Sequence, residues 1–208
     1  MDLTSTAFAD GERIPEPYAF GAPDAENHFK LSQNRNPQLA WSGAPEGTRS
    51  FALVCVDPDV PSKPDDVNQE DREVPEDLPR VDFYHWAMVD IPAHLTRIEE
   101  GECSAEVTAG GKIQPPGPDV ARQGLNSFTD WFAEDPDMGG KYFGYDGPAP
   151  PWNDSLMHHY HFKLFALDID RVNVSGEFDG PAVLEAIKGH VLAEASIVGT
   201  YTMNQRLL

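Results

Sequence analysis

The apolar residues of this chain come in short runs that Pro, Gly and charged residues interrupt at close intervals. Residues 51–56 form a continuous apolar run that stops at the Asp-Pro-Asp-Val-Pro sequence of 57–61, which predicts a strand followed by a rigid turn. Further strands are predicted at 81–89, 160–167 and 197–202. Many short strands separated by Pro and Gly favour a mainly β sandwich or barrel over a doubly wound sheet.

Helical periodicity is confined to two segments. A helix is predicted within 179–192, where Pro181 suits the first helical position and apolar residues recur every four positions, at Val183, Ile187 and Val191. A shorter helix is predicted around 127–133, with Asn126 or Ser127 as its N-cap. The strands are therefore expected to carry only a few peripheral helices, one of them near the C-terminus.

Net charge restricts the partners of the protein. The 208 residues carry a formal charge of −20, from 35 acidic and 15 basic side chains. Nucleic-acid binding relies on Lys and Arg contacts with phosphate, so this charge excludes a nucleic-acid-binding protein to a first approximation. Attachment to an anionic membrane is disfavoured for the same reason. A length of 208 residues fits one globular domain, and two cysteines form at most one disulfide, so we predict a single domain, 1–208, that folds on its own core.

The N-terminal residues predict a cytoplasmic protein. Residues 1–4 lack both the basic and the apolar part of a secretion signal, and no window approaches about 18 consecutive apolar residues. Integral membrane association is therefore not expected. The acidity is spread from Asp2 to Asp179 and fits either an ordinary acidic cytosolic protein or one adapted to high salt.

Residues 62–80 differ in composition from the predicted strands on either side. The segment contains seven acidic and three basic residues together with several prolines. We predict an acidic insertion loop between the two strands. Most charged segments of this kind are simply solvated, and the alternative is a docking surface for a partner.

Two histidines are predicted to face inward. Successive side chains of a strand point to opposite faces, and this alternation groups His85 with Phe83, Ala87 and Val89. It groups His158 with a largely apolar set, Tyr160, Phe162, Leu164 and Ala166. His159 and His161 fall on the opposite, more polar face. A single histidine at a strand end usually has a structural role, but these two are expected to lie near each other.

Asp57 and Asp59 end a strand that is expected to run close to both inward-facing histidines. Two carboxylates and two imidazoles can bind a metal, perform acid–base chemistry, or hold an anion while the carboxylates orient the imidazoles. The enzyme alternative is a metal-assisted hydrolase that uses the same cluster. Against it, the chain has no His-Glu-x-x-His, Gly-x-Ser-x-Gly or Walker sequence, and neither Cys55 nor Cys103 has a basic neighbour.

Four motifs carry a resemblance to a known family. They are the Asp-Pro-Asp-Val-Pro sequence at 57–61, the strand sequence at 82–92, the Gly/Pro loop Gly-Tyr-Asp-Gly-Pro-Ala-Pro-Pro at 144–151, and His-His-Tyr-His-Phe at 158–162. In this order they resemble the phosphatidylethanolamine-binding protein (PEBP) family, and especially its prokaryotic Raf-kinase-inhibitor-like branch. The resemblance covers nearly the whole chain.

The resemblance implies an antiparallel Greek-key β-sandwich with a small pocket for phosphate, acetate or a phosphorylated head group, and no cofactor. It also implies a kinase or a protease as a regulated partner. Transferred position by position, the ligand-binding residues are Asp57, Pro58, Asp59, Pro61, His85, Gly147, Pro148, His158 and Tyr160. We therefore predict non-catalytic binding of a small anionic or phosphorylated ligand.

Two departures from the family pattern concern the pocket. The family usually has Gly-x-His-Arg where this chain has Leu-Met-His-His at 156–159, so that His159 replaces the family arginine. The acidic insertion at 62–80 lengthens the connection between the first motif and the strand of His85. Both changes are expected to alter the rim of the pocket.

Overall fold

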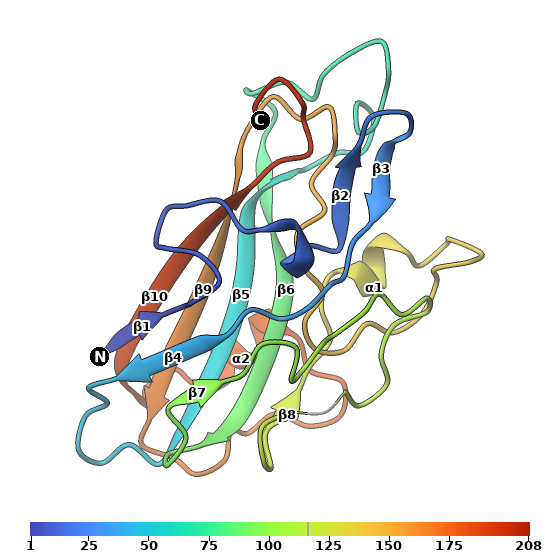
Figure 1. Ribbon diagram of the computed structural model, residues 1–208. Helices are drawn as coiled ribbons and strands as arrows, with labels where there is room; N and C mark the ends of the chain where they lie inside the picture. The colour runs from blue at the N-terminus through green and yellow to red at the C-terminus, as the bar shows by residue number, and fades with distance from the viewer. Residues whose placement is uncertain (116) are drawn as a thin grey trace.

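The computed structural model describes residues 1–115 and 117–208, and its largest element is a five-stranded antiparallel sheet (Figure 1). The strand order is β10-β9-β5-β6-β8, and every neighbouring pair is antiparallel. The bounds are β5 (Ser50–Pro61), β6 (Arg80–Pro92), β8 (Arg122–Gln123), β9 (His158–Leu167) and β10 (Val191–Tyr201). The predicted mainly β fold is confirmed.

A smaller sheet packs on one face of the large sheet. It consists of β1 (Asp2–Thr4), β4 (Leu39–Ser42) and β7 (Arg97–Ile98), in the order β1-β4-β7. Apolar side chains of both sheets interlock in the larger core, which includes Leu39 and Trp41 from one sheet and Leu53 and Phe162 from the other. A separate hairpin of β2 (Gly21–Asp24) and β3 (His28–Leu31) lies beside this sandwich (Figure 1).

Helix α2 (Gly180–Ala186) covers the opposite face of the large sheet and closes a second core there. Pro181 lies in its first turn, and Asp179 caps it by accepting a hydrogen bond from the Ala182 amide at 2.9 Å. The helix is shorter than the predicted periodicity suggested. The chain takes a left-handed conformation at Gly189, with φ of +82°, and Val191 begins β10 instead of continuing the helix.

The other helical segments are single turns. Helix α1 (Phe128–Trp131) starts where predicted, and the Asn126 side chain accepts the Phe128 amide at 3.0 Å. The 3-10 turn η1 covers Glu16–Tyr18. Phe128 stacks on Phe20 with ring centroids 4.6 Å apart, so that α1 is anchored beside the sheet. Within the described residues, no helix has the length and apolar character needed to cross a bilayer.

Strand β5 continues through the Asp-Pro-Asp-Val-Pro motif, so the predicted turn at 57–61 is wrong. The pairing with β6 shifts between Asp57 and Val60, which inserts an extra residue into β5. Because the strand absorbs this residue as an irregularity, it stays paired with β6 as far as Pro61. The chain turns only in the segment that follows.

A second irregularity changes the side of the sheet on which His85 lies. Cys55 pairs with Trp86 and Val56 pairs with Tyr84, so His85 is an extra residue of β6. The predicted grouping of His85 with Ala87 and Val89 is wrong, since those two residues belong to the core beneath α2. His85 instead contacts Tyr160, at a centroid distance of 5.0 Å. The predicted apolar face of β9 is confirmed, with Tyr160, Phe162, Leu164 and Ala166 all in the larger core.

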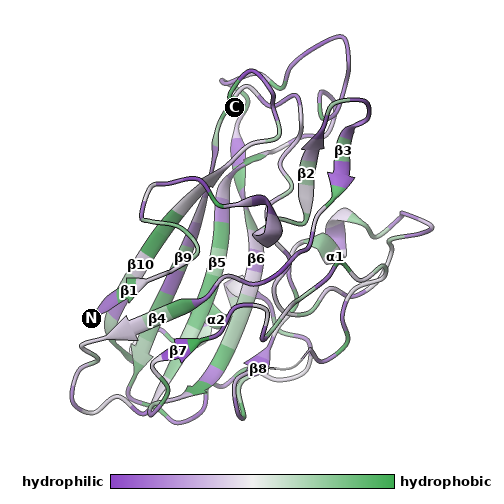
Figure 2. Ribbon diagram, viewed as in Figure 1, coloured by the Kyte–Doolittle hydropathy of each residue, from purple (hydrophilic) through white to green (hydrophobic). Residues whose placement is uncertain are grey.

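Hydropathy follows this layered arrangement. Figure 2 shows hydrophobic residues concentrated along the strands of the large sheet, whereas the connection between β5 and β6 is mainly hydrophilic. That connection is the predicted insertion, and it lies at the end of the sheet where β5 ends and β6 and β9 begin. Asp57, His85 and Tyr160, which belong to the sequence motifs, lie close together at this end of the sheet.

Candidate functional site

A small cavity opens at the end of the large sheet where β5 ends and β6 and β9 begin. It encloses about 50 Å³ and is mainly apolar. Four of the nine predicted ligand-binding residues line it, namely Asp57, Pro61, His85 and Tyr160. The other lining residues are Val60, Val67, Asn68, Phe83, Phe128, Trp131, Ala149, Pro150 and Pro151.

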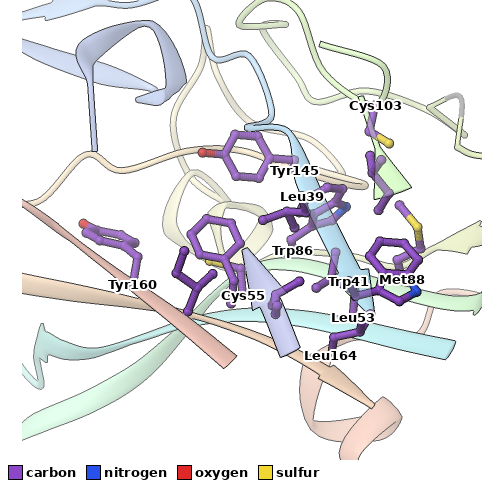
Figure 3. Packing of buried hydrophobic residues seen from close by; sticks show 14 of the residues in the cluster. Leu39, Trp41, Leu53, Cys55, Trp86, Met88, Cys103, Tyr145, Tyr160 and Leu164 are labelled. Atoms are coloured by element: carbon purple, nitrogen blue, oxygen red, sulfur yellow. The ribbon is translucent and has the colours of Figure 1, made fainter. Parts of the chain in front are cut away.

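Tyr160 supplies a polar group to the wall of this cavity. Its side chain is only 1% exposed, yet its hydroxyl makes no hydrogen bond of normal geometry with any described residue. Burial, and then the nearby Asp57 carboxylate, raise the pKa of Tyr160 well above its usual value, so the hydroxyl keeps its proton. Figure 3 shows the ring at the margin of the core cluster, with the hydroxyl directed away from the other labelled residues.

His85 is a buried, neutral imidazole. Its Nδ1 lies 2.8 Å from the carbonyl oxygen of Asp146, which can only accept, so the proton is on Nδ1. Burial lowers the pKa of His85 below its usual value, although the Asp57 carboxylate opposes this effect. Only Nε2 remains for a ligand. The rings of Tyr160 and Phe128 meet the imidazole edge to face and fix its plane.

His158 lies behind the cavity wall, where it joins two carboxylates. Its Nδ1 is 2.7 Å from Asp57 Oδ2, and its Nε2 is 3.1 Å from Asp154 Oδ2. Both ring nitrogens therefore donate, which requires the imidazolium form. Burial alone lowers the pKa of His158, but the two carboxylates outweigh it and raise the pKa to about 9. The residue is fully buried and has no ring nitrogen left for a ligand.

Arg80 completes a chain of four charges. Its guanidinium donates to both oxygens of Asp154, at 2.6 and 3.1 Å, and to the Asp59 carbonyl at 2.8 Å. The order Asp57, His158, Asp154, Arg80 alternates negative and positive groups, so their formal charges cancel. Burial raises the pKa of Asp154, but His158 and Arg80 lower it by more, and its net shift is downward.

Asp59 lies outside the cavity lining, on the far side of the irregularity in β5. Its Oδ2 accepts from the backbone amide of His159 at 2.9 Å and from the ring Nδ1 at 2.8 Å. His159, for which the family resemblance implies an arginine, is thus an exposed partner of Asp59. Pro58 lies between the two aspartates and is also absent from the lining. Asp57 and Asp59 therefore face different histidines.

Gly147 and Pro148 support the cavity wall from behind. The Gly147 amide donates to Asn34 Oδ1 at 2.8 Å, so this amide is not free for a ligand. A Cβ at Gly147 would lie 2.1 Å from the Tyr18 carbonyl oxygen, which explains the glycine. The Pro148 carbonyl accepts the amides of Phe20 and Gly21. These contacts fix the Gly/Pro loop that carries Ala149 and Pro150 to the cavity.

The neighbouring Asp146 anchors the same loop. It is fully buried, and its carboxylate accepts from Asn34 at 2.6 Å, from Asn126 at 2.7 Å and from Lys112 at 2.6 Å. Its carbonyl oxygen is the partner of His85. The contacts of the Asp146 carboxylate thus hold in place the backbone carbonyl that fixes the His85 tautomer.

Sequence reasoning missed Asp154, Arg80 and the lining residues of the insertion. Asp154 precedes His158 by four positions, and that spacing was the available signal, but no regular element links the two residues.

Among residues 1–115 and 117–208, no group of three or more His, Cys, Asp or Glu is arranged to hold a metal ion.

Known proteins share this sequence pattern along nearly the full chain. The phosphatidylethanolamine-binding protein family model matches residues 4–202. A UPF0098 protein of Methanothermobacter thermautotrophicus is 34% identical over 203 residues, covering 97% of this chain and 98% of that protein. The UPF0098 protein YbhB of Escherichia coli is 30% identical over 202 residues, with 97% and 100% covered.

Solved structures agree with the sequence comparison. The crystal structure of Escherichia coli YbcL, described as a new member of the mammalian PEBP family, superposes with a TM-score of 0.69 at 29% identity, covering 97% of both chains. The homologue CT736 of Chlamydia trachomatis gives a TM-score of 0.64 at 26% identity, covering 96% of this chain and 95% of that one. The chain therefore belongs to the phosphatidylethanolamine-binding protein family.

Proposed function

We propose that the cavity binds a small anion or the phosphorylated head group of a ligand, without catalysing a reaction on it. The observation that carries this proposal is the buried Tyr160 hydroxyl, a donor that lies near the Asp57 carboxylate but makes no hydrogen bond of normal geometry with any described residue. An unpaired buried hydroxyl costs about 1–3 kcal/mol, which a ligand acceptor would recover. His85 lies beside it in the same wall. In the neutral form its Nε2 can only accept, so it accepts from a protonated ligand oxygen, or donates to an anion after His85 takes up a proton.

The charge chain makes Asp57 compatible with an anion nearby. One carboxylate oxygen of Asp57 accepts the Asp59 amide at 2.8 Å, and the other accepts His158 at 2.7 Å. Because His158 neutralises it, Asp57 does not present an unbalanced negative charge to the cavity. The chain of four charges has no net charge, so it adds none beside the cavity to the −20 that the protein carries as a whole.

The predicted ligand-binding residues have two roles in this proposal. Asp57, Pro61, His85 and Tyr160 contact the ligand. The remaining five position those contacts, through the charge chain, the irregular end of β5 or the Gly/Pro loop: Pro58, Asp59, Gly147, Pro148 and His158. The name of the family supports a phosphorylated head group as one ligand.

Titration of the isotopically labelled protein with inorganic phosphate and with phosphoethanolamine tests this function by NMR. We expect saturable shifts at the cavity residues, and at least tenfold weaker binding in His85→Ala and Tyr160→Phe. Tyr18→Phe is the matched control, because its hydroxyl bonds Glu100 on the surface. Binding that survives both cavity substitutions unchanged would overturn the assignment.

We propose a cytoplasmic location and a kinase or protease as the regulated partner. Cell fractionation tests the location, and inhibition assays with candidate enzymes test the partner.

The arrangement of the described His, Cys, Asp and Glu residues does not support the alternative function, a metal-assisted hydrolase. A phosphoester hydrolysis assay in the presence of divalent metals, with turnover abolished by His85→Ala, would revive it.

A further inference from the structure

The acidic insertion, residues 62–80, forms part of the cavity wall. Val67 and Asn68 line the cavity together with His85 and Tyr160. Asn68 also lines an adjoining apolar groove and so lies where the two spaces meet. The insertion is therefore more than a solvated connection between β5 and β6, since part of it faces the place where a ligand would bind.

One buried side chain fixes the course of the insertion. Asn153 is 5% exposed, and its Nδ2 lies within hydrogen-bond distance of the carbonyl oxygens of Asp66, Gln69 and Arg72, at 2.8, 3.1 and 2.9 Å. Its Oδ1 accepts the Asn68 amide at 2.8 Å. Val74, fully buried, pairs with Asp154 beyond this point. These contacts hold the insertion against the loop that leads into β9.

Asn68 has an unusual backbone and an uncommitted donor. Its φ is +57°, a left-handed conformation that Asn tolerates better than most residues other than Gly. Its Oδ1 accepts the Trp152 amide at 3.1 Å, which limits rotation of the carboxamide. The residue is exposed, and its Nδ2 makes no hydrogen bond with any described residue, so this donor is available to solvent or to a ligand. Strained conformations that the surroundings hold in place tend to occur where a residue contacts a ligand.

We infer that Asn68 is a ligand-contacting residue of this cavity and that the insertion determines which anions enter it. The inference rests on the proposed function. The Asn68 Nδ2 donates to an oxygen of a ligand bound beside Tyr160 and His85. A neutral amide is the donor, and the insertion around it is rich in carboxylates, so the site favours a small anion of low charge over a bulky or highly charged one.

Substitution of Asn68 by Asp tests the inference with little change in shape. Asp also tolerates a positive φ and keeps an oxygen for the Trp152 amide, while the NH₂ donor is lost. Gln69→Glu is the matched control, because it adds the same charge one residue away, outside the cavity lining. Asn68→Gly removes the donor without adding charge and keeps the backbone conformation.

Affinity for inorganic phosphate, measured by calorimetry at physiological salt, is the readout. We expect Asn68→Asp to weaken binding at least tenfold and Asn68→Gly about three- to tenfold, against at most about twofold for Gln69→Glu, whose charge is screened. Equal losses in Asn68→Asp and Gln69→Glu, with none in Asn68→Gly, would overturn the contact.

The two proposals fail in different ways. If the unaltered protein binds phosphate and only His85→Ala and Tyr160→Phe lose it, the proposed function stands and the role of Asn68 is wrong. If the unaltered protein binds no phosphate, both proposals are overturned.

A parallel titration with acetate tests selectivity. We expect the ratio of phosphate to acetate affinity to change in Asn68→Gly, and an unchanged ratio would contradict selection by the insertion.

Discussion

The region around His85 and the region around His158 lie at the same end of the sheet, and both histidines are buried, yet the two surroundings give them opposite charge. His85 meets aromatic rings and one carbonyl oxygen, and burial lowers its pKa. His158 meets two carboxylates, which raise its pKa to about 9 despite burial. Only His85 lines the cavity. Burial alone therefore does not determine the charge of a histidine, because its hydrogen-bond partners can reverse the effect.

Removal of each histidine should separate the two regions most strongly. His158→Ala leaves two carboxylates without their shared cation, and we expect a loss of about 3–5 kcal/mol in the free energy of unfolding. His85→Ala removes one hydrogen bond and a ring, with an expected loss of about 1–3 kcal/mol. Urea denaturation monitored by fluorescence measures both. Equal losses would contradict the assignment of His158 to the charge chain.

The two histidines should make the free energy of unfolding depend on pH in opposite directions. The pKa of His158 is raised in the folded state, so its contribution is complete below the unfolded pKa of about 6.5 and is lost as pH rises through about 9. We expect the free energy of unfolding to fall by up to about 3 kcal/mol across that window. Denaturation from pH 6 to 10 measures it. The absence of this alkaline limb would indicate a neutral His158 at pH 7.

The same linkage has the opposite sign for His85. Its pKa is lowered in the folded state, so its contribution is complete above the unfolded pKa and is lost as pH falls below about 6.5. Within the acid limb, His85→Ala should therefore remove part of the pH dependence. An acid limb identical to that of the unaltered protein would exclude a buried neutral His85.

Anion binding should be coupled to proton uptake in one region only. A bound anion beside neutral His85 favours the imidazolium form, so affinity should rise as pH falls from 8 to 5.5, by at most about tenfold per pH unit. Inorganic sulfate is the probe, because its own charge is constant over this range. Calorimetric titration measures the slope, which should persist in Tyr160→Phe and vanish in His85→Ala. A slope that remains in His85→Ala would assign the proton to another group.

The smallest effect is expected at His159. This residue occupies the position at which the family resemblance implies an arginine, and its pair with Asp59 at 2.8 Å is half exposed. Exposed pairs contribute about 0–1 kcal/mol, so His159→Ala should change the free energy of unfolding by no more than that. Phosphate affinity should be unchanged. A loss comparable to that of His158→Ala would show that the exposed pair belongs to the charge chain.

Local patterns predicted the strands and the inward direction of β9, because alternation is a property of neighbouring residues. The side on which His85 lies could not follow from alternation, since it depends on an irregularity in the pairing with β5. The Asp and Pro residues at 57–61 predict a turn, and only the pairing with β6 keeps this motif in the strand. Helix α2 ends at Ala186, before the predicted limit, and Gly189 then turns the chain toward β10.

The charge chain depends on long-range placement of residues. Arg80 and Asp154 are 74 residues apart in sequence, and neither lies in a motif that marks it as a partner of His158. Their meeting requires the insertion to fold back onto the loop before β9, which the Asn153 contacts determine. The sequence therefore predicted that the two histidines and Asp57 lie near one another, whereas their different charge states required the three-dimensional arrangement.

NMR titration of the two imidazole rings tests the opposite charge of the two regions most directly. At pH 7, nitrogen chemical shifts should report a doubly protonated His158 and a neutral His85 with its proton on Nδ1. On raising the pH, His158 should lose its proton near pH 9, whereas His85 should titrate only below its usual pKa of about 6.5. A neutral His158 at pH 7, or a protonated His85, would contradict the account.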